Sequence, residues 1–83
     1  MEYIYNPRGV CSRQFVFDIE ESKIVNVRII GGCPGNLLGI SSLIKGMKVD
    51  DIIERMQGIR CGLKPTSCPD QIAKALISYK NQL

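Results

Sequence analysis

Two adjacent stretches decide the fold: QFVFDIE at residues 14–20 and KIVNVRI at residues 23–29, joined by Glu21-Ser22. Apolar side chains occupy every second position of both stretches, with residues such as Asn26 and Arg28 between them. A period of two is typical of half-buried antiparallel strands, because successive side chains point to opposite faces of the sheet. We therefore predict a β-hairpin. Its buried face is predicted to carry Phe15, Phe17, Ile19, Val25, Val27 and Ile29.

The flanking sequence extends this hairpin at its N-terminal side and changes character after it. Tyr3-Ile4-Tyr5 predicts a third strand, ended by Asn6-Pro7. Downstream, apolar residues recur at helical spacing and predict helices over about 36–45, about 48–57 and from Cys68 onward. The predicted helical stripes are Leu37, Ile40, Leu43 and Ile44; Val49, Ile52, Ile53 and Met56; and Ile72, Leu76, Tyr79 and Leu83.

The order of these segments, strands first and helices after, is typical of the α+β class. Glycines at 46 and 58 fit helix C-caps, and Pro69 with Asp70 fits the first turn of the third helix. With 83 residues the chain is long enough for one domain. We expect a single domain over residues 1–83, in which a small antiparallel sheet carries three short helices packed on one face.

Composition limits the classes of partner. Eleven Lys and Arg against eight Asp and Glu give a net charge of +3, and the basic residues never form a run of three. A nucleic-acid interface is normally a basic cluster, so nucleic-acid binding is not expected. A helix-turn-helix is also disfavoured, because its second helix would turn Asp50, Asp51 and Glu54 toward phosphates. No stretch resembles a membrane span or a signal peptide, so we expect a cytoplasmic protein.

Cysteine is the residue type that offers the most chemistry. The chain has no histidine, which excludes Ser-His and Cys-His nucleophiles and zinc sites that use imidazole. It has four cysteines, Cys11, Cys33, Cys61 and Cys68, a number that matches a tetrahedral Cys₄ zinc site. No Cys-x₂-Cys pair is present, so the alternative of isolated buried thiols stays open.

Cys68 is the candidate for a single reactive thiol. The N-terminus of a helix stabilises a thiolate through its backbone N–H groups and dipole. Cys61 would then serve as the resolving partner of a redox pair. The alternative is that Cys68 merely occupies the N-cap position while Ser67 or Thr66 makes the capping hydrogen bond.

The segment between the hairpin and the first helix is rich in glycine: Gly31-Gly32-Cys33-Pro34-Gly35-Asn36. Such a loop can hold a phosphate or nucleotide on backbone N–H groups, which makes Gly31, Gly32, Gly35 and Asn36 candidate ligands. It lacks the ending of a Walker A loop. The alternative is that the glycines supply a sharp turn with positive φ angles.

Three ordered segments resemble the TSCPD domain family. They are Thr66-Ser67-Cys68-Pro69-Asp70, from which the family takes its name, together with the glycine-rich segment above and Gly58-Ile59-Arg60-Cys61-Gly62. The resemblance runs from about Cys11 to Leu83. The family includes short stand-alone proteins of unknown function, which this chain resembles, and a region near the C-terminus of adenosylcobalamin-dependent ribonucleotide reductases.

The resemblance implies a link to nucleotide reduction and DNA synthesis, but no catalytic residue of the reductase maps onto this chain. Radical chemistry needs a large barrel and a cofactor site, so adenosylcobalamin is not expected to bind these 83 residues alone. We therefore expect an accessory or binding module with a cysteine-based zinc site, which acts with a ribonucleotide reductase or another protein. The alternatives are a thiol redox protein and a phosphate-binding domain. The open edge of a small sheet also suggests a homodimer.

Overall fold

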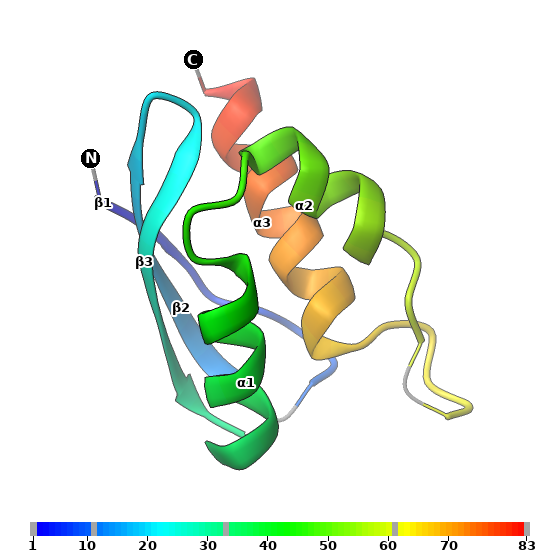
Figure 1. Ribbon diagram of the computed structural model, residues 1–83. Coiled ribbons are helices and arrows are strands. Elements are labelled where there is room, and N and C mark those ends of the chain that lie inside the picture. The colour runs from blue at the N-terminus through cyan, green and yellow to red at the C-terminus, as the bar shows by residue number, and fades with distance from the viewer. Residues whose placement is uncertain (1, 11, 33, 61, 83) are drawn as a thin grey trace.

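The structure, a computed structural model, describes residues 2–10, 12–32, 34–60 and 62–82, without the side chains of Pro34 and Asn36. Three strands come first: β1 (Glu2–Tyr5), β2 (Ser12–Glu20) and β3 (Lys23–Gly31). Three helices follow: α1 (Pro34–Ile44), α2 (Val49–Met56) and α3 (Cys68–Asn81). The predicted α+β class and the order of its elements are thus confirmed (Figure 1).

The strands form one antiparallel sheet in the order β1-β2-β3. β2 and β3 are joined by Glu21 and Ser22, whose φ angles are 52° and 61°. A two-residue turn with two positive φ angles matches the twist of the strands that it joins. The predicted hairpin and the predicted third strand are therefore both present.

One position of the hairpin was predicted wrongly. The register passes from Asp18↔Asn26 directly to Ile19↔Ile24, so that Val25 is an extra residue on β3. Such a β-bulge shifts the alternation of side chains by one residue. Ile24 is therefore fully buried, while Val25, predicted to face the core, is 43% exposed.

The hydrophobic core joins one face of the sheet to the helices. Phe15, Phe17 and Ile19 of β2 belong to the same buried cluster as Ile44, Ile52 and Leu76. β1 is tied to α3 by Tyr3, whose hydroxyl donates to Ser78 Oγ at 2.9 Å and whose ring meets that of Tyr79 edge-on. The most extensive contacts of the helices with other elements are those of α1 with β3 and of α2 with α3. That all three helices pack directly on the sheet stays a prediction.

The first helix differs from its prediction at Leu43. Leu37 and Ile44 are buried as predicted, but Leu43 is 75% exposed. Leu38 is also mostly exposed. Leu43 lies about 100° from Ile44 around the helix axis, and the surface that covers α1 is too narrow to include both residues. α1 therefore presents two leucines to solvent, on either side of its buried face.

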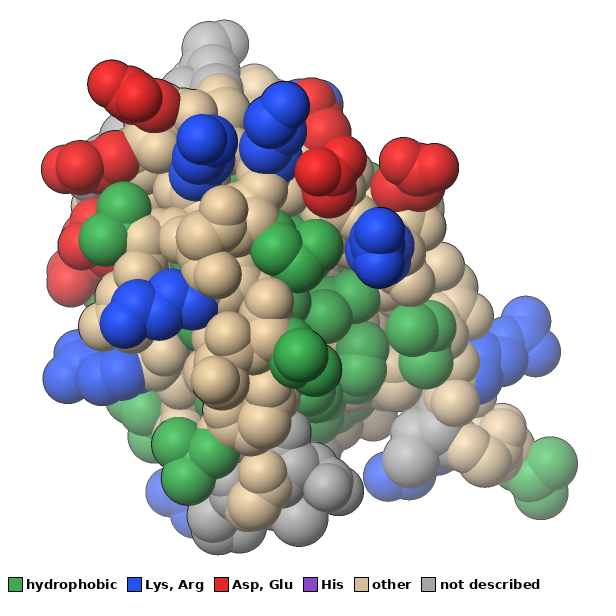
Figure 2. All heavy atoms as spheres, in the orientation of Figure 1, with side chains coloured by type: hydrophobic (Ala, Val, Ile, Leu, Met, Phe, Trp, Pro, Cys, Tyr) green, Lys and Arg blue, Asp and Glu red, His purple; other side chains and the backbone are tan. Residues whose placement is uncertain are grey.

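The segment between α1 and α2 covers the beginning of the outer edge of β3. The N–H of Ile24 donates to the carbonyl of Met47 at 3.0 Å, and the N–H of Gly46 donates to the carbonyl of Ile24 at 2.7 Å. Figure 2 shows the molecule from the side of α1, with charged side chains mostly around the margin of the view. Among the described residues, no helix has the length and apolar character needed to cross a membrane.

Candidate functional site

The first turn of α3 is built by a capping serine. Ser67 lies just before the helix with extended backbone angles, and its Oγ accepts a hydrogen bond from the N–H of Asp70 at 3.1 Å. The same hydroxyl donates to the carbonyl of Ile59 at 2.6 Å. Ser67 is thus the N-cap, as one of the two predicted capping residues, and Cys68 is the first helical residue rather than the cap.

Asp70 holds the loop before α3 against the helix. The carboxylate is 3% exposed and accepts hydrogen bonds from the N–H of Gly58 at 2.7 Å and from the Thr66 hydroxyl at 2.5 Å. Lys74, one turn further along α3, lies 3.2 Å from the same carboxylate. The residue that we interpreted from its position as a partner of the helix dipole is therefore mainly a buried acceptor.

The hydrogen bond from Thr66 holds the pKa of Asp70 below its ordinary value of 3.8. Burial acts in the opposite direction, because it penalises the charged form. The hydrogen bond from Gly58 and the charge of Lys74 again lower the pKa. Asp70 is therefore ionised at neutral pH, and the network around it depends on that charge.

A second set of hydrogen bonds ties the segment before β2 to the same turn. Gln71 Nε2 donates to Thr66 Oγ1 at 3.0 Å, and Gln71 Oε1 accepts from the N–H of Arg8 at 3.2 Å. Gly9 has a φ of +74°, and a Cβ there would lie 3.2 Å from Thr66 Cγ2. The sequence analysis missed the roles of Thr66 and Gln71. A polar triplet Thr-x₃-Asp-Gln around a capping serine was the available signal.

Cys68 lies beside Ser12, a residue that was not predicted to belong to the site. The two side chains approach to 3.0 Å between Sγ and Oγ, and Ser12 is 4% exposed whereas Cys68 is a half-buried free thiol. Ser12 is the first residue of β2 and is paired with Gly31 at the end of β3. The start of α3 and the open end of the hairpin therefore meet at Cys68.

Of the four predicted zinc ligands, the structure describes only Cys68. Cys11, Cys33 and Cys61 lie outside the described residues, and so does the predicted redox pair of Cys61 with Cys68. Over the part of the chain that the structure describes, no three His, Cys, Asp or Glu side chains are grouped so as to hold a metal ion. The Cys₄ zinc site stays a prediction.

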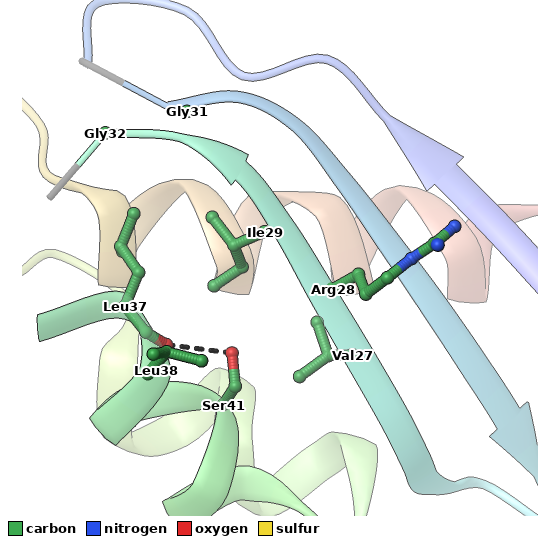
Figure 3. A pocket seen from close by; sticks show the side chains of 8 residues that line it. All are labelled: Val27, Arg28, Ile29, Gly31, Gly32, Leu37, Leu38 and Ser41. Carbon is green, nitrogen blue, oxygen red and sulfur yellow. Dashed lines mark hydrogen bonds between the residues drawn. The ribbon is translucent and has the colours of Figure 1, made fainter. Parts of the chain in front are cut away.

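The glycine-rich segment forms a turn followed by helix. Gly31 and Gly32 have φ angles of 82° and 77°, which confirms the interpretation that they supply a sharp turn. Gly35 and Asn36 fall within the first turn of α1. Beside this turn, a groove of about 360 Å³ between β3 and α1 is lined mostly by apolar side chains (Figure 3). Phosphate binding at Gly31, Gly32, Gly35 and Asn36 stays a prediction.

These features define a small α+β domain in which buried polar side chains fix one cysteine at the start of a helix. The family model of the TSCPD domain matches residues 3–80, nearly the whole chain. The chain therefore belongs to the TSCPD domain family, and Thr66 to Asp70 form the motif that gives the family its name. No curated protein and no solved structure matches the chain.

Proposed function

We propose that this chain is an accessory binding module that holds a zinc ion through thiolates at the end of the molecule where Cys68 lies. The observation that carries the proposal is the contact of Cys68 Sγ with Ser12 Oγ at 3.0 Å, since Ser12 follows Cys11 directly in the chain.

Hydrogen bonding and strand pairing hold chain neighbours of the other cysteines near the same place. Ser12 is paired with Gly31, two residues before Cys33. Ser67 donates to the carbonyl of Ile59, two residues before Cys61. Consecutive Cα atoms are about 3.8 Å apart, so one or two residues span only a short distance. Of these neighbours, Ser12 contacts Cys68 itself, Gly31 is paired with Ser12, and Ile59 contacts Ser67, the residue before Cys68.

Zinc suits this donor set and this size of domain. Four thiolates bind Zn²⁺ tetrahedrally at about 2.3 Å, and histidine is absent from the chain. A small domain buries limited apolar surface, so its core alone gives little stability. A structural metal adds to that stability.

The test is metal analysis of the full chain purified without chelator, together with titration of its thiols. We expect about one equivalent of zinc, and thiols that become fully reactive only after chelation. Cys68→Ser should lose the metal, whereas Ser42→Ala, an exposed change on α1, should keep it. Less than about a tenth of an equivalent, with all four thiols reactive from the start, would overturn the proposal.

A second candidate is a thiol redox protein that uses Cys68, and the Ser12 hydroxyl favours it. A hydroxyl within hydrogen-bonding distance of sulfur can donate to the thiolate, the nucleophilic form of cysteine. Alkylation of Cys68 in chelator-treated protein should then be about fivefold slower in Ser12→Ala than in the unchanged chain at one pH. Equal rates would argue against this candidate, and mild oxidation should also yield a Cys61–Cys68 disulfide.

The proposed partner of the module is an adenosylcobalamin-dependent ribonucleotide reductase, and this rests on the resemblance to a region of those enzymes. A direct test is to titrate a purified reductase into the fluorescently labelled chain and to follow anisotropy. Saturable binding that Leu63→Asp or another surface change can weaken is the expected outcome. Unchanged anisotropy at high reductase concentration would show that the reductase does not bind the chain.

A further inference from the structure

The groove between β3 and α1 is an apolar surface that the proposed thiol site does not use. Val27 and Ile29 of β3 and Leu37 of α1 point into it in Figure 3, and Leu38 and Ser41 complete its wall on the helix. Arg28 points to the other side of the strand. Ser41 does not offer its hydroxyl to the groove, because that hydroxyl donates to the carbonyl of Leu37 at 2.8 Å. The groove is therefore suited to apolar side chains rather than to a phosphate.

The groove lies along an open strand edge. β3 is the last strand of the sheet order β1-β2-β3, and the segment from Gly46 to Lys48 covers its outer edge at Lys23 and Ile24. From Val25 to Gly31, the described residues provide no strand on that side. Ile30 is 43% exposed beside this edge. An uncovered edge offers backbone N–H and C=O groups to another strand.

The helix beside this edge carries no charge. The eleven residues of α1, from Pro34 to Ile44, include no Asp, Glu, Lys or Arg, and Leu38 and Leu43 are 70% and 75% exposed. Figure 2 shows uncharged and apolar side chains over α1 in the middle of this face, with charged side chains around it. Helices that face only water normally carry charged residues on their outer side.

The distribution of charged residues indicates which kind of partner suits this face. In a two-fold dimer the same patch lies on both subunits, so a charged patch brings like charges together. The chain as a whole has a net charge of +3, and two copies of the uncharged α1 can meet without that repulsion, provided that the β3 register does not place Arg28 opposite Arg28. Two antiparallel copies of one strand edge also satisfy each other, because residue i pairs with j and j with i.

We propose that a second copy of this chain docks here, with β3 antiparallel to β3 and α1 against α1. The two sheets then form one sheet of six strands, and apolar side chains of each copy fill the groove of the other. Burial of Leu38 of each copy and of both strand edges stabilises the dimer.

The glycines of α1 fit this arrangement. A Cβ at Gly35 or at Gly39 would meet nothing within 4 Å inside the chain, so internal packing does not require glycine at either place. Glycine within a helix is less favourable than alanine. A neighbouring helix can approach a glycine surface closely, which gives both residues a use in the dimer.

The test is sedimentation equilibrium of the full chain from about 1 μM to about 1 mM, a range that covers weak and moderate dimers. Leu38→Lys places like charges across the two-fold axis at the wall of the groove and should raise the dissociation constant about 100-fold or more. Leu63→Lys is the matched control, because Leu63 is fully exposed on the loop before α3 and lies outside the groove. It should leave the dissociation constant unchanged.

Hydrogen exchange gives a second measurement that needs no variant. In the unchanged chain, amides of residues 26–31 should exchange more slowly at high than at low protein concentration, whereas those of β1 at the opposite edge should not change. A monomer throughout the concentration range would overturn the proposal. A dimer retained in Leu38→Lys, or protection that appears at β1 instead of β3, would overturn it as well.

Discussion

The dipeptide Cys-Pro occurs twice at the start of a helix, and the two helix starts are built differently. α3 begins at Cys68-Pro69 and has a capping serine and a buried Asp70 in its first turn. α1 begins at Pro34, directly after Cys33, and has no acidic residue in its first turn. It is preceded instead by Gly31 and Gly32 with positive φ angles. Side chains fix the first start, and backbone conformation directs the second.

The difference has consequences for what each region can do. Around α3 the polar side chains are buried and paired, and the described residues hold no buried side-chain N or O atom without a hydrogen bond. That satisfied network gives Cys68 a defined position against Ser12. Around α1 the described side chains form no such network, and the glycine turn leads into an apolar groove beside an open edge. The first region suits a fixed chemical group, and the second suits a docking partner.

The largest expected effect comes from removing the carboxylate of Asp70. Asp70→Ala leaves the N–H of Gly58 and the hydroxyl of Thr66 without their acceptor in a buried place. Hydrogen bonds to a charged group contribute about 1.5–3 kcal/mol each, so the free energy of unfolding should fall by about 3 kcal/mol. Urea denaturation measures it.

Asp51 provides the matched control for this change. It is exposed in the first turn of α2 and contributes mainly to the helix dipole, so Asp51→Ala should cost about 0.5 kcal/mol or less. Similar losses in the free energy of unfolding for the two variants would mean that Asp70 contributes no more than an ordinary acidic residue at a helix start.

A second pair of changes tests whether backbone conformation directs the start of α1. Gly31 has a φ of +82°, and a Cβ there would lie 3.0 Å from Arg13 Cγ and 3.2 Å from the Arg13 backbone nitrogen. Gly31→Ala should therefore destabilise the chain by about 2 kcal/mol.

Gly35 lies four residues further on, inside α1, where a Cβ would meet nothing within 4 Å. Gly35→Ala should stabilise the monomer by up to about 1 kcal/mol, because alanine favours the helix. Both changes are measured by thermal unfolding at low protein concentration. A gain from both substitutions would remove the argument that the turn needs glycine.

The capping serine gives a smaller effect. Ser67→Ala removes the acceptor for the N–H of Asp70 and the donor to the carbonyl of Ile59, and a lost N-cap costs about 1 kcal/mol. Ser42→Ala, on the exposed side of α1, should change the free energy of unfolding by less than about 0.5 kcal/mol. If the two serines proved equivalent, the contrast between the helix starts would not extend to capping.

Strand alternation and helical spacing were sufficient to predict the order of elements, the hairpin and most of the core. They failed at Val25 because a β-bulge depends on how two strands pair, which one strand alone does not encode. They failed at Leu43 because the spacing of apolar residues does not reveal how much of the helix surface other elements cover.

The candidate site was predicted at Cys68 but not at its neighbours. Ser12 is 56 residues away in the chain, and only the fold brings its hydroxyl to the thiol. Thr66 and Asp70 could be placed at a helix start from local sequence, but their burial depends on the loop at Gly58 folding back over them. Local patterns predict which groups cap a helix, whereas contacts between distant segments decide which of them are buried.

The smallest effect is a dependence on pH that belongs to α3 alone. The Thr66 hydroxyl, assisted by Gly58 and Lys74, lowers the pKa of Asp70 below 3.8, so the ionised carboxylate stabilises the fold. That contribution is fully present above 3.8 and is lost as the pH falls through the lowered folded pKa. The free energy of unfolding should therefore drop below about pH 4 more steeply in the unchanged chain than in Asp70→Asn, which does not titrate there. In NMR spectra of the unchanged chain, the chemical shift of the Gly58 amide should change with this titration, while those of α1 amides should not. Parallel stability curves for the two proteins would show that the charge of Asp70 adds nothing that its neutral amide cannot supply.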